Sequence, residues 1–175
     1  MIPRYVPDAV FHTRVRNPAL DGDNPFEWQN LTTDDVFAGK RIVLFAVPGA
    51  FTPACSDSHL PGFERLHDEF LAEGIDRVIC VSVNDAFVLY QWGLSREISK
   101  VHMLPDGNGE FTRKMGMLVE RSNHGMGMRS WRYSALVKDR MIAKFFAEPQ
   151  FRDNPAGVPL DVSSAETILE EIRRG

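Results

Sequence analysis

Short apolar runs bounded by turn residues recur along the chain. Residues 41–47 (RIVLFAV) and 77–83 (RVICVSV) are short and rich in β-branched side chains, which predicts two buried strands. Residues 101–106 (VHMLPD) predict a third strand. The segments RYSALVKD and MIAKFFAE flank a turn near residues 139–140, and this pattern predicts a β-hairpin.

Apolar residues at helical spacing lie between these runs. Phe63, Leu66 and Phe70 recur at intervals of three or four residues, and Gly74 is placed to end the helix that they predict. Pro61 lies inside the same pattern, so a kink is expected there. The other predicted elements are, in chain order, a helix through Phe87, Val88 and Trp92 capped by Asn84 or Asp85, a short helix at FTRKMGM, loops over residues 122–130 and 149–159, and a final helix, AETILEEIRR, capped by Ser163 or Ser164.

This alternation of strands and helices is typical of an α/β fold. The chain shows no repeat and no linker-like stretch, and its 175 residues suit one hydrophobic core. We therefore expect residues 1–175 to form a single domain with a central mixed β-sheet flanked by helices. A thioredoxin-like arrangement fits the order of the elements.

The composition narrows the class of protein. A hydrophobic fraction of 43% and a charged fraction of 25% are ordinary for a soluble globular domain. The net charge of −4 gives no reason to expect nucleic acid or an anionic membrane as a partner. No apolar run approaches the roughly 20 residues of a membrane span, and the first residues do not form a signal peptide.

The cysteines and histidines add to this picture. Only two cysteines occur, Cys55 and Cys80, so disulfide bonds do not build the fold, and a reducing cytoplasm is favoured. The five histidines show no metal-ligand spacing. We expect neither a metal nor a cofactor.

The segment with the clearest chemistry is PGAFTPAC, residues 48–55, between a predicted strand and a predicted helix. Such turns bind ligands in open α/β sheets. Cys55 is expected in the first helical turn, where unpaired N–H groups and the helix dipole stabilise a thiolate, the nucleophilic form of cysteine. A lone cysteine is most often a small buried apolar residue. Here the surrounding Pro, Gly and Thr residues favour a reactive thiol.

The neighbours of Cys55 fit this interpretation. Thr52 lies three residues earlier, a spacing that can aim its hydroxyl at the sulfur, where it can donate to a thiolate while accepting from a substrate. Pro48 and Pro53 are rigid and have no N–H, so we expect them to shield the sulfur from bulk water.

The longer segment PGAFTPACSDSHLPGF resembles the active-site signature of the peroxiredoxins, specifically the Prx5 (type II, atypical) subfamily. The family pattern Pro-x-x-x-Thr-x-x-Cys is matched by Pro48, Thr52 and Cys55, and HLPGF is particular to this subfamily. Further similar segments are VSVNDAFV, LPDGNGEFTRKMG and GMRSWRYSALV, so the resemblance runs from about residue 41 to about residue 137.

The resemblance implies a thiol peroxidase acting on hydrogen peroxide and organic hydroperoxides. The Cys55 thiolate would attack the terminal peroxide oxygen and become a sulfenic acid, while Thr52, the Cys55 N–H and an arginine hold both oxygens. Arg132 matches the family's arginine, and Arg129 is a neighbouring candidate of lower rank. Without the resemblance, Arg132 would be interpreted as a solvated charge at a strand end.

The resemblance also bears on how the sulfenic acid is reduced. No Cys-x-x-Cys motif is present, and Cys80 lies in a predicted buried strand. Cys80 is either a structural thiol, which we favour, or a resolving thiol. A 1-Cys mechanism follows, recycled by glutathione or glutaredoxin, with thioredoxin a less favoured reductant. Similar family members are fused to a C-terminal glutaredoxin domain.

The subfamily often forms homodimers, which we expect here. Phe51 and Trp92 are candidates for the dimer interface, although the sequence alone makes them ordinary core aromatics. His59, four residues after Cys55, lies on the same helix face. It is either an imidazolium that stabilises the thiolate or, as we favour, a neutral residue bonded to a nearby loop.

Two other functions remain open at this stage. A cysteine hydrolase would need a histidine base for Cys55, oriented by a third group. A peroxide-responsive redox sensor or interaction protein would use the same oxidation of Cys55 without steady turnover.

Overall fold

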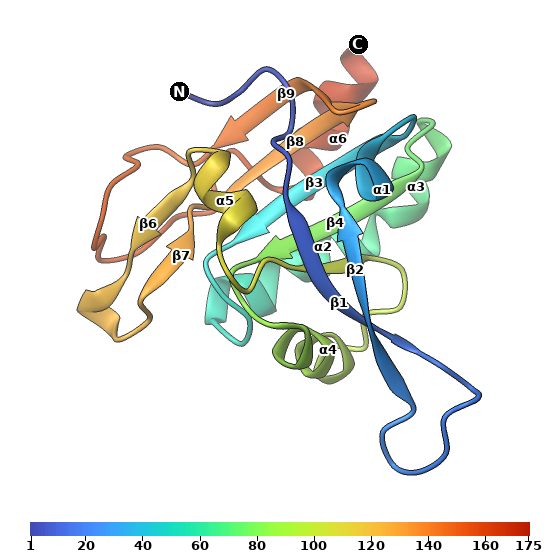
Figure 1. The fold of residues 1–175 in the computed structure, drawn as a ribbon. Helices are drawn as coiled ribbons and strands as arrows, with labels where there is room; N and C mark the ends of the chain where they lie inside the picture. Colours follow the sequence, from blue (N-terminus) through green and yellow to red (C-terminus); the bar gives the residue numbers. More distant parts are fainter.

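A five-stranded mixed sheet forms the centre of the computed structural model, which describes residues 1–175 (Figure 1). In spatial order its strands are β5 (His102–Pro105), β4 (Arg77–Ser82), β3 (Arg41–Val47), β8 (Tyr133–Lys138) and β9 (Met141–Ala147). Strands β3, β4 and β5 are parallel, whereas β8 is antiparallel to β3 and pairs with β9 as the predicted hairpin. The predicted α/β fold with a central mixed sheet is confirmed.

The sheet separates two apolar clusters. Alternate residues of β3 point to opposite faces, so Ile42 and Leu44 belong to one cluster and Val43 and Phe45 to the other. The second cluster also contains Cys55. A strand buried on both faces has no polar face, which explains why residues 41–47 are apolar throughout.

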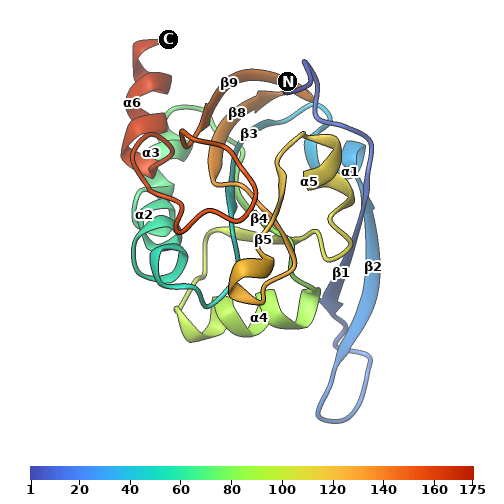
Figure 2. The ribbon, with the colours of Figure 1, turned by 90° about the vertical axis from the view of Figure 1, so that its left-hand side faces the viewer.

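Different elements cover the two faces (Figure 2). On the face with Cys55 lie α2 (Leu60–Arg65), α3 (His67–Ala72) and α6 (Ala165–Arg174). On the opposite face lie α1 (Thr33–Phe37), α5 (Glu110–Lys114) and the hairpin of β1 (Val10–Arg16) and β2 (Phe26–Thr32). Helix α4 (Ala86–Ser95) adds Leu89 and Trp92 to the cluster around Cys55. None of these helices has the length and apolar character needed to cross a bilayer.

Two hairpins were not predicted. Strand β2 is exposed at most positions, so it lacks the apolar alternation by which a half-buried strand is found. The short pair β6 (Leu118–Glu120) and β7 (Met128–Ser130) flanks a 3₁₀ turn, η2 (Ser122–His124), so the predicted loop over residues 122–130 is partly wrong.

The helix predicted after Cys55 is divided into segments. It begins with a π-helical turn, η1 (Cys55–His59), in which the N–H of Leu60 donates to the carbonyl of Cys55 five residues earlier. Pro61 lies just after this irregularity, near the start of α2, and has no N–H to donate to the preceding turn. Gly74 follows α3 with a φ of +79°, as its predicted role in ending the helix requires.

Candidate active site

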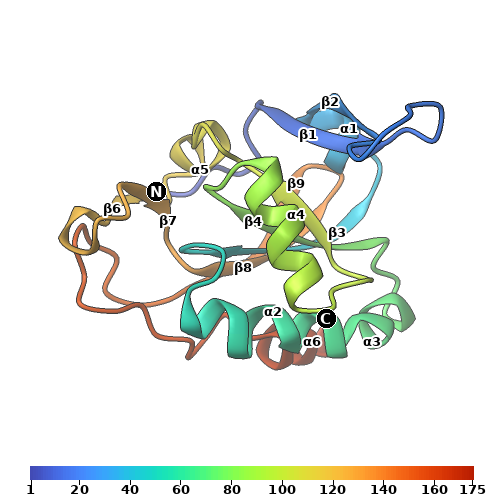
Figure 3. The same cartoon turned by 90° about the horizontal axis from the view of Figure 1, so that it is seen from below.

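The site lies where β3 ends and β8 begins (Figure 3). Because β8 is antiparallel to β3, with Tyr133 opposite Ala46, the residue just before β8 reaches the same end of the sheet as the turn just after β3. Arg132 therefore meets Cys55, although 77 residues separate them: its Nη2 lies 3.5 Å from Cys55 Sγ.

Cys55 and Arg132 are both buried. Cys55 is fully inaccessible and Arg132 is 2% exposed, and no ion pair in the chain includes this arginine. The N–H of Ser56 donates to the carbonyl of Thr52 at 3.0 Å, so Cys55 lies in the first helical turn, as predicted. The Arg132 guanidinium has no carboxylate partner and is held within hydrogen-bond distance of the sulfur, where both groups are removed from solvent.

Thr52 and Pro48 flank the sulfur in different ways. The spacing between Thr52 and Cys55 predicted that the Thr52 hydroxyl donates to the sulfur. Instead, this hydroxyl donates to the carbonyl of Gly49 at 2.7 Å. Its oxygen keeps a lone pair for a substrate O–H. Pro48 is buried beneath the turn, whereas Pro53 is exposed and does not shield the sulfur.

His59 holds Arg132 in place. Its Nε2 lies 2.9 Å from the carbonyl oxygen of Ser163, so Nε2 carries the proton, and Nδ1 accepts from Arg132 Nη1 at 3.0 Å. Burial, together with the Arg132 charge, lowers the pKa of His59 to about 3. The imidazolium interpretation of His59 is therefore wrong, and the neutral residue bonded to a nearby loop is confirmed.

Three comparisons place this geometry among known proteins. Residues 17–169 match the Redoxin family model. The chain is 56% identical to Peroxiredoxin sll1621 of Synechocystis over 173 residues, 99% of this chain and 92% of that protein. It is 44% identical to the hybrid peroxiredoxin hyPrx5 of Haemophilus influenzae over 95% of this chain and 64% of that protein. The crystal structure of the Plasmodium falciparum antioxidant protein, titled a 1-Cys peroxiredoxin, superposes with a TM-score of 0.90 at 36% identity, covering 98% of both chains.

The chain belongs to the peroxiredoxin family. Its relatives include the hybrid Prx5 protein, and it is a peroxiredoxin of the Prx5 type. It is accordingly a thiol-dependent peroxidase, an oxidoreductase.

A carboxylate beyond the site supports His59 in this peroxiredoxin. Glu148 Oε1, at the end of β9, accepts from the N–H groups of residues 161–163 and from the Ser163 hydroxyl at 2.7 to 3.0 Å. It thereby holds the Ser163 carbonyl in position for His59. The sequence carries no motif for Glu148, since the loop that it binds returns to it only in the folded chain.

Two further side chains fix the turn itself. Asn84 Oδ1 accepts from the Ala50 N–H at 3.0 Å, and Trp92 Nε1 donates to Ser56 Oγ at 3.0 Å. Trp92 is fully buried in the apolar cluster around Cys55 and is not available for a surface contact, whereas Phe51 is 54% exposed. The sequence suggested Asn84 only as a possible helix cap, and Asp85 performs that role.

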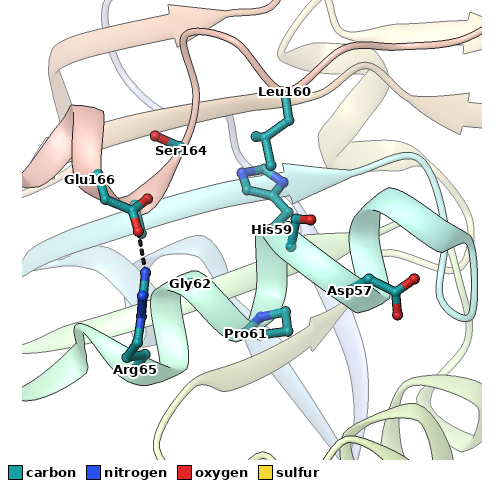
Figure 4. A pocket seen from close by; sticks show the side chains of 10 residues that line it. Asp57, His59, Pro61, Gly62, Arg65, Leu160, Ser164 and Glu166 are labelled. Atoms are coloured by element: carbon teal, nitrogen blue, oxygen red, sulfur yellow. Dashed lines mark hydrogen bonds and ion pairs between the residues drawn. The ribbon is translucent and has the colours of Figure 1, made fainter.

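A pocket of about 540 Å³ lies behind His59, between α2 and the segment that leads into α6 (Figure 4). The ion pair between Arg65 and Glu166 borders one side of it. Cys55 does not line this pocket.

Cys80 and Arg129 do not contact the Cys55 sulfur. Cys80 is fully buried in β4, and its pKa is raised by burial and by the charge of Cys55. The Arg129 guanidinium donates from Nε to the carbonyl of Met126. Of the two candidate arginines, the structure thus brings Arg132 to the sulfur. No three metal-binding side chains gather anywhere in the chain.

Proposed function

We propose that Cys55 is the peroxidatic thiol, and the contact between Arg132 and Cys55 Sγ carries this proposal. The thiolate attacks the terminal oxygen of ROOH, the O–O bond breaks, and one oxygen is transferred to sulfur. The products are the sulfenate of Cys55 and ROH, which is water or an alcohol after the leaving oxygen takes the peroxide proton.

Arg132, Thr52 and Pro48 have separate roles in this proposal. Arg132 Nη2 stabilises the thiolate and then the charge that develops on the peroxide oxygens. The Thr52 hydroxyl, already donating to Gly49, accepts from the peroxide O–H and orients it. Pro48 closes the apolar floor of the turn. His59 is not a base for Cys55, because both ring nitrogens are bonded elsewhere, which disfavours a cysteine hydrolase.

We propose a 1-Cys cycle. Cys80 is the other cysteine, and both are free thiols. Burial raises the pKa of Cys80, so it supplies little of the thiolate that attacks a sulfenic acid. The similarity to the Plasmodium falciparum antioxidant protein, a 1-Cys peroxiredoxin, supports the same cycle.

The proposed reductant is glutathione, assisted by glutaredoxin, acting on hydrogen peroxide or organic hydroperoxides. One glutathione condenses with the sulfenic acid and releases water, and a second thiol exchanges with the mixed disulfide to restore Cys55. Because Cys55 is fully buried, a thiol of this size reaches the sulfur only after the turn opens.

We also propose a homodimer. Helix α4 exposes Phe87, Tyr90 and Leu94 by 50%, 46% and 56%, and Trp28 lies against Phe87 with ring centroids 5.6 Å apart. Apolar side chains gathered on one surface are typical of an association site. Sedimentation velocity is expected to show a dimer that Leu94→Glu weakens; a wild-type monomer at micromolar concentration would contradict the proposal.

We further propose that residues 1–175 act as one domain in the cytoplasm, where its two thiols stay reduced. Subcellular fractionation tests the compartment. A single cooperative unfolding transition tests the domain assignment.

Peroxide consumption tests the catalytic proposal. It is measured with glutathione plus glutaredoxin and, separately, with thioredoxin, for wild type, Cys55→Ser and Cys80→Ser. We expect no turnover from Cys55→Ser and continued turnover from Cys80→Ser with glutaredoxin. Loss of turnover in Cys80→Ser would make Cys80 the resolving thiol, and full activity in Cys55→Ser would refute the proposed site.

A further inference from the structure

Two arginines without carboxylate partners lie beside the turn that carries the active site. Arg121 follows β6 and Arg129 lies in β7, and the β6–β7 hairpin is at the same end of the sheet as that turn (Figures 1 and 3). No ion pair in the chain includes either arginine. Positive charge without a carboxylate partner is thus concentrated beside the turn that carries Cys55.

Arg129 lies directly over the active-site turn. Its Nη1 is 2.9 Å from the position that a Cβ on Gly49 would occupy, and a methyl carbon of Thr52 is 3.5 Å from the same position. Gly49 therefore leaves room for a guanidinium next to Thr52. The Nε donates to the Met126 carbonyl at 2.9 Å, which fixes the plane of the guanidinium and leaves its Nη atoms without a partner in the chain.

Arg121 lies on the same face of the β6–β7 hairpin as Arg129. Val119 pairs with Arg129 in the β6–β7 register, and the N–H of Arg121 donates to the Gly127 carbonyl, so strand alternation puts Arg121 and Arg129 on one face. Arg121 is only 7% exposed, and its Nε has no hydrogen-bond partner. The preceding carboxylate, Glu120, accepts instead from the Ser122 hydroxyl.

A buried, unpaired guanidinium beside a second one is costly unless an anion joins them. Burial and the neighbouring Arg121 charge lower the pKa of Arg129, which shows that the two charges oppose each other. A planar guanidinium matches a carboxylate through two parallel N–H···O bonds. A carboxylate between the two arginines would relieve both the repulsion and the unmet hydrogen bond of Arg121.

We propose that Arg121 and Arg129 form a binding site for the carboxylate of a small molecule that reacts at Cys55. Resting on the proposed function, the expected source is a carboxylate of the glutathione that reduces the sulfenic acid. An organic hydroperoxide that carries a carboxylate has the same group and would bind in the step that oxidises Cys55. In either case the arginines hold the molecule over Gly49 while its sulfur or oxygen reacts in the turn below.

The thiol arm of the test uses single-turnover reduction. Protein oxidised with one equivalent of hydrogen peroxide is mixed with glutathione or with 2-mercaptoethanol, which has no carboxylate, for wild type, Arg129→Gln and Arg121→Gln. The rate constant with glutathione is expected to fall by roughly tenfold or more in each variant, since a hydrogen bond to a charged group is lost. The rate constant with 2-mercaptoethanol is expected to stay unchanged.

The peroxide arm compares oxidation of reduced Cys55 by tert-butyl hydroperoxide and by a fatty-acid hydroperoxide. A loss confined to the fatty-acid hydroperoxide would assign the carboxylate to the oxidant. Arg16→Gln is the matched control, because Arg16 is exposed at the far end of β1 and its loss removes the same charge.

Binding of S-methylglutathione, which cannot react, is measured by calorimetry on Cys55→Ser protein with and without Arg129→Gln.

The outcomes separate this inference from the function on which it rests. The carboxylate site would be overturned if the variants and wild type reacted at the same rate with glutathione and with the fatty-acid hydroperoxide. It would also be overturned if the rate with 2-mercaptoethanol fell as much as the rate with glutathione. Either result would leave the glutathione cycle intact. No reduction of wild type by glutathione would instead refute the proposed reductant. If Arg121→Gln does not fold, Arg129→Gln, which replaces a half-buried side chain, decides the question.

Discussion

Two buried thiols lie on the same face of the sheet, and their surroundings differ in almost every respect. Cys55 and Cys80 belong to one apolar cluster, and neither is accessible to solvent. Cys55 lies in the first turn of a helix with a guanidinium nitrogen 3.5 Å from its sulfur. Cys80 lies in the middle of a parallel strand, where burial raises its pKa.

This difference shows that burial alone does not determine how a thiol behaves. Both sulfurs are removed from solvent, but only Cys55 has a guanidinium nitrogen within hydrogen-bond distance. The two sites differ in their hydrogen-bond donors: the guanidinium of Arg132, which is held by His59, donates to the sulfur of Cys55.

The largest effect is expected from removing the Cys55 sulfur. Cys55→Ser should abolish peroxide reduction, because a serine hydroxyl does not ionise at neutral pH and cannot accept the transferred oxygen. Stopped-flow peroxide consumption measures this. Residual turnover in the variant would mean that Cys80 also reacts, and the contrast between the two thiols would fail.

A large effect is also expected when the guanidinium at Cys55 is replaced by an ammonium. Arg132→Lys keeps the charge but loses the two separate guanidinium nitrogens that reach the sulfur and His59 Nδ1, so the rate of Cys55 oxidation should fall by about 10²–10³. The measurement is the second-order rate constant with hydrogen peroxide. Arg16→Lys is the control, and equal rates for Arg132→Lys and wild type would show that charge alone suffices.

His59 is expected to make stability depend on pH. Its pKa is about 3 in the fold against 6.5 for the ordinary group, so the unfolded chain binds a proton that the folded chain excludes. The stabilisation is complete above pH 6.5 and is lost towards pH 3, by up to about 1.4 kcal/mol per pH unit. Urea unfolding at pH 7 and pH 5 should show a steeper loss for wild type than for His59→Gln. Parallel losses would contradict the buried, neutral His59.

The smallest effect is expected at Cys80. Cys80→Ala should lower the free energy of unfolding by about 1 kcal/mol, through lost packing in the cluster, and leave the rate of Cys55 oxidation unchanged. Denaturant unfolding and single-turnover oxidation measure the two quantities. A slower oxidation step would show that Cys80 contributes to the environment of Cys55 after all.

The sequence predicted the central strands and the helix ends because each depends on local chemistry. The apolar run of β3, the Asp85 and Ser164 caps and the positive φ of Gly74 are all set by a few neighbouring residues. The β1–β2 hairpin escaped prediction because β2 is mostly exposed and shows no alternation.

At the site, local pattern supplied the turn, Cys55, Thr52 and Pro48, whereas Arg132 came from the motif similarity alone. Of the residues that hold these groups in place, Glu148 was missed, and His59 was expected to bond to a nearby loop but not to Arg132. Glu148 acts through a loop that is distant in sequence, and the bonds of His59 to Ser163 and Arg132 join positions 104 and 73 residues away. Such contacts exist only after the sheet has formed.

The antiparallel pairing of β8 with β3 has a consequence for synthesis of the chain. Arg132 follows Cys55 by 77 residues, so a ribosome finishes β3 and the cysteine turn long before it makes the arginine. During that interval Cys55 has no guanidinium beside it and stands as an unassisted thiol. On the proposed mechanism, fast peroxide reduction therefore requires a chain in which β8 has been made and paired with β3, and a shorter or misfolded copy carries a cysteine that lacks the arginine.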